Sequence, residues 1–444
     1  MGEQMSVDAL QEQVEADLTE FKVPGVSWAV IDGDEITATG QAGRAAADGD
    51  RLVDDRTIFQ ACSISKPITT FAMLRLVDRG LLDLDEDVNH RLTSWQIPPT
   101  GTWQPVVTLR QLVSHSAGLT VSGFPGYRHN DELPTTVQIL DGVRPANTFG
   151  VRVDTVPGTQ FRYSGGGTTV VQQLLEDVTG TPFRQLLREL VLEPLGMRDS
   201  DYAQPLPPDR HGQAATAHDE QGEPLDGRWN TYPELAAAGL WTTPTDLCRF
   251  ALGVRAAYSG AGGALLSTGL AREMLTPQMP STARIGGLDS LGLGLFLGGG
   301  GTTFGHSGGN AGFRCHLIAY RDTGQGAAVM TNGDNGVWVL QKAFASLATQ
   351  YGWIGYPQEL IELSEPSPEE LDKLCGRYEL RKTSLEIARD GSSLEVTFAG
   401  QEALTFFATG QNRFATSFAD TQLVVRDGEL YFVQNEEELP CRRL

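Results

Sequence analysis

Apolar positions in the first part of the chain recur with two different periods. Residues 7–21 carry apolar side chains four positions apart, which places them on one face and predicts a helix. Residues 23–43 are rich in β-prone side chains and are interrupted at Asp32-Gly33-Asp34, so they predict two strands joined by a hairpin turn. A second helix is predicted over residues 65–76, because its apolar positions fit one face and Gly80 follows its end.

The middle of the chain, residues 80–255, combines helical patterns with long loops rich in proline and glycine. Its clearest helix is predicted over residues 168–179, where an apolar stripe is followed by Gly180. Short β-prone runs separated by glycine turns return at residues 291–336, and a helix is predicted directly after them, over 337–351. Both ends pairing in one antiparallel sheet, with a helical part inserted between them, is the economical α+β arrangement.

The last part of the chain has a different character. Residues 357–374 are rich in Ser, Pro and Glu and predict a linker. Residues 375–444 contain short alternating runs separated by turn residues, which predicts a small all-β domain, either a barrel or a sandwich. Residues 1–356 then form the larger domain. The strands predicted in the last domain are Gly376–Leu380, Ser384–Ala388, Leu394–Phe398, Leu404–Ala408, Leu423–Val425 and Leu430–Val433.

Composition and charge narrow the classes of partner. The chain has 34 Lys and Arg against 56 Asp and Glu, a formal charge of −22, which argues against nucleic acid and anionic membranes as partners. We find no secretory signal and no apolar run of membrane-spanning length. The five cysteines are widely spaced and lack a CxxC pair, so we expect a reduced, cytoplasmic protein. The oligomeric state is not predicted.

The stretch QACSISKPITTF, residues 60–71, contains the first candidate chemistry. Ser63 and Lys66 are three positions apart, so a helix beginning here places both on one face. A serine hydroxyl is a weak nucleophile until a base takes its proton, and a lysine serves as that base where burial or neighbouring cations lower its pKa. Taken alone, the stretch fits an ordinary capped helix start better than a nucleophile beside its base.

Two further stretches carry residues that a serine nucleophile needs. PGTQFRYSGGG, residues 157–167, places Tyr163 in a glycine-rich turn, where it could relay a proton between the nucleophile and the leaving group. FGHSGGNAGF, residues 304–313, places His306, Ser307, Gly308 and Gly309 on or beside a late strand. Glycines let a backbone pass close to a substrate, and free backbone N–H groups there could stabilise an oxyanion.

Together, Ser63-x-x-Lys66, Tyr163-Ser-Gly165 and His306-Ser-Gly308 resemble the three motifs of the serine β-lactamase and penicillin-binding-protein superfamily. The branch they resemble most is that of the class C β-lactamase-like esterases and D-peptidases, and the resemblance spans roughly residues 8–350. It implies an α+β, β-lactamase-like transpeptidase fold, with an antiparallel sheet flanked by helices and a helical subdomain. Similar text includes VTLRQLVSHSAGL (107–119), LEPLGM (192–197) and AAAGLWTTPTDLCRF (236–250).

The resemblance also implies a role for each motif residue. Ser63 would be the acylated nucleophile, and Lys66 and Tyr163 would share general acid–base work. The backbone N–H groups of Ser63 and Gly309 would form the oxyanion hole, with His306 and Gly308 also at the substrate. No cofactor and no metal is implied, and His129, His211 and His218 lack metal-ligand spacing.

Two departures from the family pattern bear on the substrate. The second motif usually ends in Asn, whereas this chain has Gly165; the third usually begins with Lys, whereas this chain has His306. The amide and the cation that hold a β-lactam substrate are therefore missing, which favours esters, amides or peptides. If a penicillin were bound, Arg314 would be the first candidate for the missing cation.

Alternatives remain at both the residue and the function level. Gly305-His306-Ser307-Gly308-Gly309 fits the G-x-S-x-G nucleophile elbow, but a strand-like run follows it where that motif needs a helix. His115 is a possible triad base, although its surroundings favour a structural loop. The predicted function is a serine hydrolase cleaving an ester or amide of a small molecule or peptide. The alternatives are an acyltransferase or peptide cyclase using the same acyl-enzyme, and a non-catalytic ligand sensor.

Overall fold

The computed structural model describes residues 7–285, 288–356, 363–364, 366–381, 383–398, 403–410, 412–416, 421–434 and 437–444. These residues fall into two compact units. The first comprises Met1–Ser281 and Leu288–Tyr356, and the second comprises Thr282–Gly287 and Pro357–Leu444. No helix in the described part of the chain is both long enough and apolar enough to cross a bilayer.

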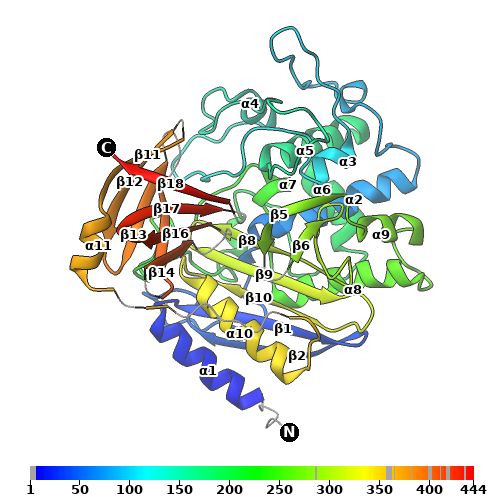
Figure 1. Cartoon of the computed structure of the whole chain (residues 1–444). Helices are drawn as coiled ribbons and strands as arrows, with labels where there is room; N and C mark the ends of the chain where they lie inside the picture. Colours follow the sequence, from blue (N-terminus) through cyan, green and yellow to red (C-terminus); the bar gives the residue numbers. More distant parts are fainter. Residues whose placement is uncertain are drawn as a thin grey trace. The chain divides into compact units, whose positions relative to one another are not determined.

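The first unit contains all but residues 282–285 of an eight-stranded sheet with the strand order β2-β1-β10-β9-β8-β7-β6-β5 (Figure 1). The N-terminal hairpin enters this sheet by antiparallel pairing of β1 with β10, with Trp28 opposite Val329. The predicted α+β class, with both ends of the large domain in one antiparallel sheet, is confirmed. The strands are β1 Gly25–Asp32, β2 Glu35–Gly43, β5 Met279–Ile285, β6 Leu288–Leu291, β7 Phe296–Gly298, β8 Thr303–Asn310, β9 Phe313–Tyr320 and β10 Gly326–Thr331.

Helices cover both faces of this sheet. The helices α1 (Val7–Glu20, blue in Figure 1) and α10 (Gly336–Gln350, yellow) pack together, and α10 lies on β9 and β10. The ammonium of Lys342 on α10 lies 2.9 Å from Asp17 Oδ1 on α1 and joins the two helices. The helix α8 (Pro244–Ser259) packs against β1 and β10 from the other side. The helices α1 and α10, at the two ends of the first unit, therefore share one face of the sheet.

The inserted segment between β2 and β5 is mainly helical and contains the main apolar core. The helix α2 (Ser65–Asp78) is buried almost all round, which is the pattern of a helix in the middle of a core. The remaining elements are β3 Phe59–Gln60, η1 Cys62–Ile64, η2 Val88–His90, α3 Leu109–Val113, α4 Thr136–Asp141, α5 Gly165–Thr179, α6 Phe183–Leu187, η3 Arg188–Leu192, η4 Pro208–Arg210, α7 Leu235–Ala238, β4 Trp241–Thr242 and α9 Thr268–Met274.

The helix α5 begins three residues earlier than predicted, at three consecutive glycines. The Ser164 side chain caps it by accepting a hydrogen bond from the Gly167 N–H at 2.9 Å. A Cβ atom on Gly165 would lie 2.9 Å from Phe124, so the helix start packs closer to a neighbouring loop than other residues allow. Glycine lowers helix propensity, and here the cap and the tertiary packing outweigh that cost.

The second unit is a closed eight-stranded barrel in sequential strand order, β11 to β18. The prediction left a barrel and a sandwich open, and the structure decides for the barrel. Two of its strands were not predicted, β15 and β18, because neither shows an alternating apolar pattern; in β18 only Cys441 is buried. The strands are β11 Gly376–Leu380, β12 Thr383–Asp390, β13 Ser393–Phe398, β14 Ala403–Ala408, β15 Arg413–Thr416, β16 Thr421–Arg426, β17 Glu429–Gln434 and β18 Glu437–Arg443.

The predicted linker, residues 357–374, is not a linker throughout. Its last seven residues form the helix α11 (Pro368–Leu374), which begins with a capping box between Ser367 and Glu370. Leu371 is fully buried in the apolar core of the barrel unit. This S-x-x-E signature was present in the sequence, but the high content of Ser, Pro and Glu obscured it. Residues 357–362 and 365 lie outside the described residues.

Candidate active site

The candidate nucleophile follows a strained residue. Cys62 has a φ of 52°, in the left-handed region that residues other than glycine rarely adopt. Its side chain is fully buried, and its thiol contacts the backbone oxygen of Gln60 at 3.2 Å. Such a conformation persists only where surrounding contacts hold it. The packing of Cys62 therefore fixes the sharp turn that leaves the half-buried Ser63 in η1, directly before α2.

Lys66 lies one helical turn from Ser63, as the spacing predicts. Its amine donates to Ser63 Oγ at 2.9 Å and to the Ala237 carbonyl at 2.9 Å, and its side chain is only 4% exposed. The ring of Tyr163 lies 5.1 Å from Lys66 Nζ. No carboxylate pairs with Lys66 among the ion pairs of the described residues, so its hydrogen-bond partners there are neutral oxygens.

A short segment holds this corner in place through its backbone. We call residues 236–240, most of α7 and the two residues after it, the α7 segment. Its carbonyl groups accept from Lys66 and from three other groups of the site, and one of its N–H groups donates to Ser65 Oγ at 3.1 Å. The other three contacts are Thr69 Oγ1 to the Ala236 oxygen at 3.3 Å, Asn310 Nδ2 to the Ala238 oxygen at 3.3 Å and the Ala61 N–H to the Leu240 oxygen at 2.8 Å.

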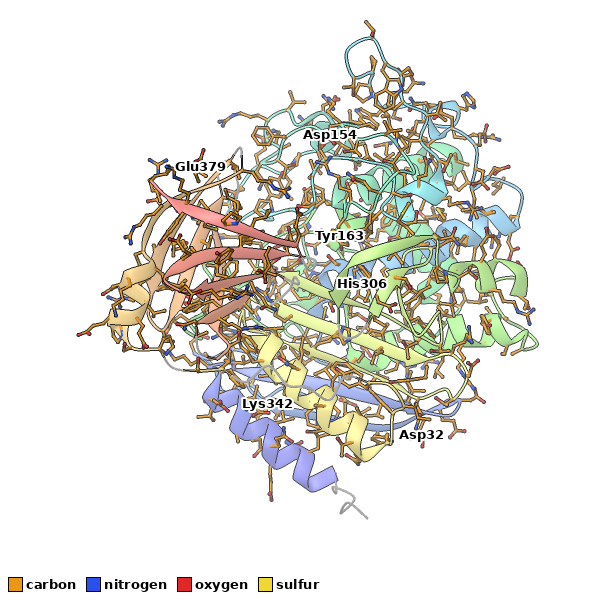
Figure 2. All side chains as sticks on the ribbon, in the orientation of Figure 1. Asp32, Asp154, Tyr163, His306, Lys342 and Glu379 are labelled. Atoms are coloured by element: carbon orange, nitrogen blue, oxygen red, sulfur yellow. The ribbon has the colours of Figure 1, made fainter. Side chains whose placement is uncertain are left out.

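Tyr163 stands directly before the cap of α5, in a cluster of aromatic rings. Its ring centroid lies 4.2 Å from that of His115, with an interplanar angle of 41°, and 6.4 Å from that of Phe296. The ring of His306, on β8, is 6.3 Å away. Figure 2 shows Tyr163 and His306 close together. The structure thus brings Ser63, Lys66, Tyr163 and His306, which are far apart in the sequence, into one site.

His306 is buried and neutral. Its Nδ1 lies 2.5 Å from the backbone oxygen of Ser307. Because a carbonyl oxygen only accepts, Nδ1 carries the proton, and Nε2 of the neutral ring is left as an acceptor. No described group bonds to that Nε2. Burial, with a smaller effect from the charge of Lys66, lowers the pKa of His306 to about 3, so its ring carries no charge at pH 7.

Strand β8 passes close to the nucleophile turn. Its pairing with β7 ends at Gly305, opposite Phe296, and the following residues lie against η1. A Cβ atom on Gly308 would be 2.5 Å from the Ala61 oxygen and 2.6 Å from Cys315 Sγ. Only glycine permits this close approach of β8 to the residues that precede Ser63. The oxyanion-hole role of the Gly309 N–H stays a prediction.

The structure places Ser307 away from this chemistry. Ser307 lies opposite His316 in the β8–β9 pairing, and its hydroxyl is 2.7 Å from His316 Nδ1. The ring of His316 packs against Phe344 of α10, on the face of the sheet remote from Lys66. Ser307 lies inside the strand β8, and the next element is the strand β9 and not a helix, so the context of a nucleophile elbow is missing.

Arg314 does not supply a free cation. Its guanidinium forms an ion pair with Asp334 at 2.9 Å and donates to the Asn310 oxygen at 2.6 Å. The same guanidinium lies beside Gly309, at 3.5 Å from a Cβ atom placed there. Within the described residues, no group of three or more His, Cys, Asp or Glu side chains is arranged to hold a metal ion.

Sequence reasoning missed two contributors to the site. Ala237 contributes its backbone carbonyl, which accepts from Lys66, so no pattern of side chains could reveal it, although the sequence around it resembles the family. His115 was assigned to a structural loop, yet its ring contacts Tyr163. Both were visible only as part of longer stretches that resemble the family, not as separate signals.

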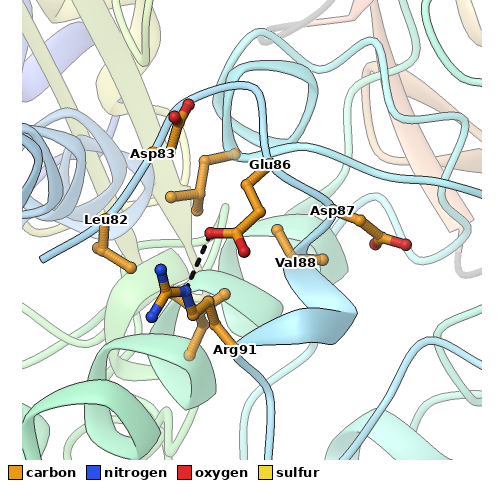
Figure 3. A pocket seen from close by; sticks show the side chains of 8 residues that line it. Leu82, Asp83, Glu86, Asp87, Val88 and Arg91 are labelled. Carbon is orange, nitrogen blue, oxygen red and sulfur yellow. Dashed lines mark hydrogen bonds and ion pairs between the residues drawn. The ribbon is translucent and has the colours of Figure 1, made fainter.

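A surface pocket elsewhere in the first unit contains none of these residues. It lies beside η2, where Arg91 Nε is 2.9 Å from Glu86 Oε2 (Figure 3). Its lining has no serine, cysteine or histidine that could act as a nucleophile or base, so it does not enter the candidate chemistry. The lining residues are Leu82, Asp83, Glu86, Asp87, Val88, Arg91, Leu109 and Leu174.

The family model described as Beta-lactamase matches residues 10–350, which is most of the chain. The chain belongs to this family. The match covers the sheet of the first unit, α2 and all three motifs. The predicted resemblance to the serine β-lactamase and penicillin-binding-protein superfamily is therefore confirmed, together with the fold class that it implied.

Curated relatives and a solved structure agree with this assignment. Esterase EstB of Burkholderia gladioli is 29% identical over 54% of this chain and 62% of EstB, so the match spans less than two thirds of that relative. Penicillin-binding protein 4 of Amycolatopsis lactamdurans is 26% identical over 83% of this chain and 96% of that protein. The octameric penicillin-binding protein homologue from Pyrococcus abyssi shares the fold, with a TM-score of 0.66, 21% identity and 99% and 100% coverage of the two chains.

Gly308→Ala tests the close approach of β8. The added methyl group overlaps the Ala61 oxygen and Cys315, so the strand has to move away from the nucleophile turn. We expect kcat to fall at least about tenfold, because small displacements at a reacting centre are costly. Gly212→Ala is the control, since a Cβ atom there meets nothing within 4 Å. Equal activity of both variants would contradict this role of Gly308.

Glu234, directly before α7, gives a test by pH. It is fully buried, neither carboxylate oxygen has a partner among the described groups, and burial raises its pKa from 4.5 to about 8. A raised pKa favours the neutral acid in the folded state. The contribution of Glu234 to the free energy of unfolding is therefore fully present below pH 4.5 and is lost as the pH rises through 8.

Glu234→Gln removes this ionisation. We expect the Tm of the variant relative to the wild type to increase between pH 5.5 and pH 9, by at least about 2 °C. Thermal unfolding at both pH values measures it, with Glu223→Gln, an exposed glutamate, as the control. A difference that is the same at both pH values would show that Glu234 does not ionise with a raised pKa.

Proposed function

We propose that this protein is a serine hydrolase that cleaves an ester or amide bond of a small molecule or peptide through an acyl-enzyme on Ser63. The observation that carries the proposal is the 2.9 Å contact between Lys66 Nζ and Ser63 Oγ, beside the ring of Tyr163. A nucleophile within hydrogen-bond reach of a base that is itself held by a third group is the arrangement that such chemistry requires.

In the proposed acylation, Lys66 takes part in its uncharged amine form, and Ser63 Oγ attacks the substrate carbonyl carbon as the serine proton passes to the lone pair of Lys66 Nζ. The carbonyl oxygen becomes an oxyanion, which the backbone N–H groups of Ser63 and Gly309 stabilise. The carbonyl then re-forms as the bond to the leaving group breaks, and the leaving oxygen or nitrogen takes a proton through Tyr163. Water attacks the acyl-enzyme by the reverse path and releases the acid.

Two features favour uncharged substrates over carboxylates. His306 stands where the family usually has a lysine, and its buried ring is neutral at pH 7, so it offers no positive charge. Gly165 stands where the family usually has an asparagine, and Phe124 closes the space that a side chain at 165 would occupy. The relative EstB carries the name esterase, which agrees with this choice.

The same acyl-enzyme could be transferred to an amine or alcohol in place of water, but no specific contact in the site favours that acceptor. The non-catalytic sensor is disfavoured by the contacts among Ser63, Lys66 and Tyr163, because binding alone requires no buried lysine on the serine. Hydrolysis is therefore the function that the site supports best.

Replacement of the two candidate serines tests the proposal. We expect Ser63→Ala to abolish turnover of p-nitrophenyl acetate and labelling by a fluorophosphonate, because both require the attacking oxygen. Ser307→Ala, the matched control on the other face of β8, should keep both. Peptide mass spectrometry of the labelled wild type locates the adduct. A label on the peptide that contains Ser307 would refute the assignment of Ser63.

The substrate preference is tested by comparing p-nitrophenyl acetate with benzylpenicillin at pH 7. We expect kcat/KM to be higher for the ester by at least about an order of magnitude, since a missing charged hydrogen bond costs about 1.5–3 kcal/mol. In His306→Lys the new cation should narrow this ratio. Equal kcat/KM of the wild type for both compounds would contradict the preference. Arg314 would then be the first candidate for a cation that binds the penicillin carboxylate.

A further inference from the structure

His115 lies outside the three motifs, yet it contacts Tyr163 of the second motif and the chain neighbour on each side of Tyr163. Its backbone carbonyl accepts a hydrogen bond from the Arg162 N–H at 2.7 Å. Its ring Nδ1 accepts one from the Ser164 N–H at 3.2 Å. Between these two bonds, the His115 ring packs on the ring of Tyr163 at 4.2 Å. One residue thus holds Tyr163 from both chain neighbours and from one side of its ring.

His115 is itself held firmly. It has a φ of 49°, a left-handed conformation that is uncommon outside glycine, and it is only 3% exposed. Its N–H donates to the Leu112 oxygen at 3.3 Å at the end of α3, and the next residue, Ser116, accepts from the Gly158 N–H at 2.7 Å. The ring therefore projects from a fixed backbone, which is the requirement for positioning a neighbouring group.

The hydrogen bond at Nδ1 also fixes the form of the ring. Because Nδ1 accepts a hydrogen bond from the Ser164 N–H, the neutral ring carries its own proton on Nε2. Burial lowers the pKa of His115 well below 6.5, and the charge of Lys66 adds to this effect. The ring therefore stays neutral over the working pH range, and Nδ1 keeps its acceptor role.

We propose that His115 is a positioning residue that sets the orientation of the Tyr163 hydroxyl relative to Lys66 and Ser63. This inference rests on the proposed function, in which Tyr163 passes a proton to the leaving group. It goes beyond that function by assigning a task to a residue that does not touch the reacting atoms. Proton transfer requires hydrogen-bond distance between the groups involved, so a displaced Tyr163 should slow chemistry and leave binding nearly unchanged.

Two substitutions separate the contacts. His115→Asn keeps a side-chain oxygen as acceptor and tolerates the left-handed backbone, but it removes the ring that packs on Tyr163. His115→Phe keeps a ring and removes the acceptor for the Ser164 N–H. The matched control is His211→Asn, since the His211 ring likewise has one hydrogen bond to the backbone, at the Leu206 oxygen, and packs on an aromatic ring, that of Trp229.

The decisive experiment is a double-mutant cycle with Tyr163→Phe, using p-nitrophenyl acetate and kcat per fluorophosphonate-labelled site. Counting labelled sites excludes misfolded protein. In the wild-type background we expect both His115 variants to lower kcat at least about tenfold, with KM changed less than about threefold. In the Tyr163→Phe background, where kcat is already roughly 10²-fold lower, they should lower it no further.

Two results of this cycle would overturn the positioning role of His115. The same fold-loss in both backgrounds, or an unchanged kcat in His115→Asn, overturns the positioning role. If His115→Phe yields no labelled protein, the Asn variant alone completes the cycle. The failure of the proposed function is distinguishable, because it would appear as a wild-type enzyme that does not label at Ser63, whatever the His115 variants do.

Discussion

Lys66 has almost no contact with water, and its amine is shared between Ser63 Oγ and the carbonyl of Ala237, each at 2.9 Å. A buried amine that loses a partner is costly, so the surrounding structure has to keep both oxygens in place. The α7 segment does so with backbone bonds to the nucleophile turn, to Ser65 and to Asn310 on β8. The helical part and the sheet of the first unit therefore meet at this lysine.

Two constraints keep the nucleophile turn and strand β8 together. Cys62 adopts a left-handed backbone conformation, and the contacts of its fully buried side chain hold it there. Gly308 allows β8 to approach within a distance that no side chain tolerates, and the Cys315 thiol beside it donates to the Ala61 oxygen at 3.0 Å. In this chain the third motif is therefore a packing requirement, besides the substrate contacts that we propose for it.

A feature could be predicted from the sequence where a local pattern of side chains marks it. The helices α1, α2 and α10 were predicted within about two residues, because their apolar periods and end signals are local. The strand β18 and the helix α11 were missed, because their sequences are rich in charged residues and contain proline, as loop sequences do. For the site, the spacing of Ser63 and Lys66 and the resemblance to the family predicted that the motif residues lie together. The contacts through the carbonyl of Ala237 and the backbone of His115 arise from tertiary packing and leave no side-chain pattern.

The central claim is that a covalent acyl group forms on Ser63 with Lys66 as the base. The most direct measurement is acid-quenched peptide mass spectrometry of the enzyme sampled during turnover of p-nitrophenyl butyrate. The account predicts one butyryl group per chain, on the peptide that contains Ser63, and predicts that Lys66→Ala accumulates it far more slowly. Turnover with no adduct at any sampled time, equally fast accumulation in Lys66→Ala, or a butyryl group on another serine would each contradict this mechanism.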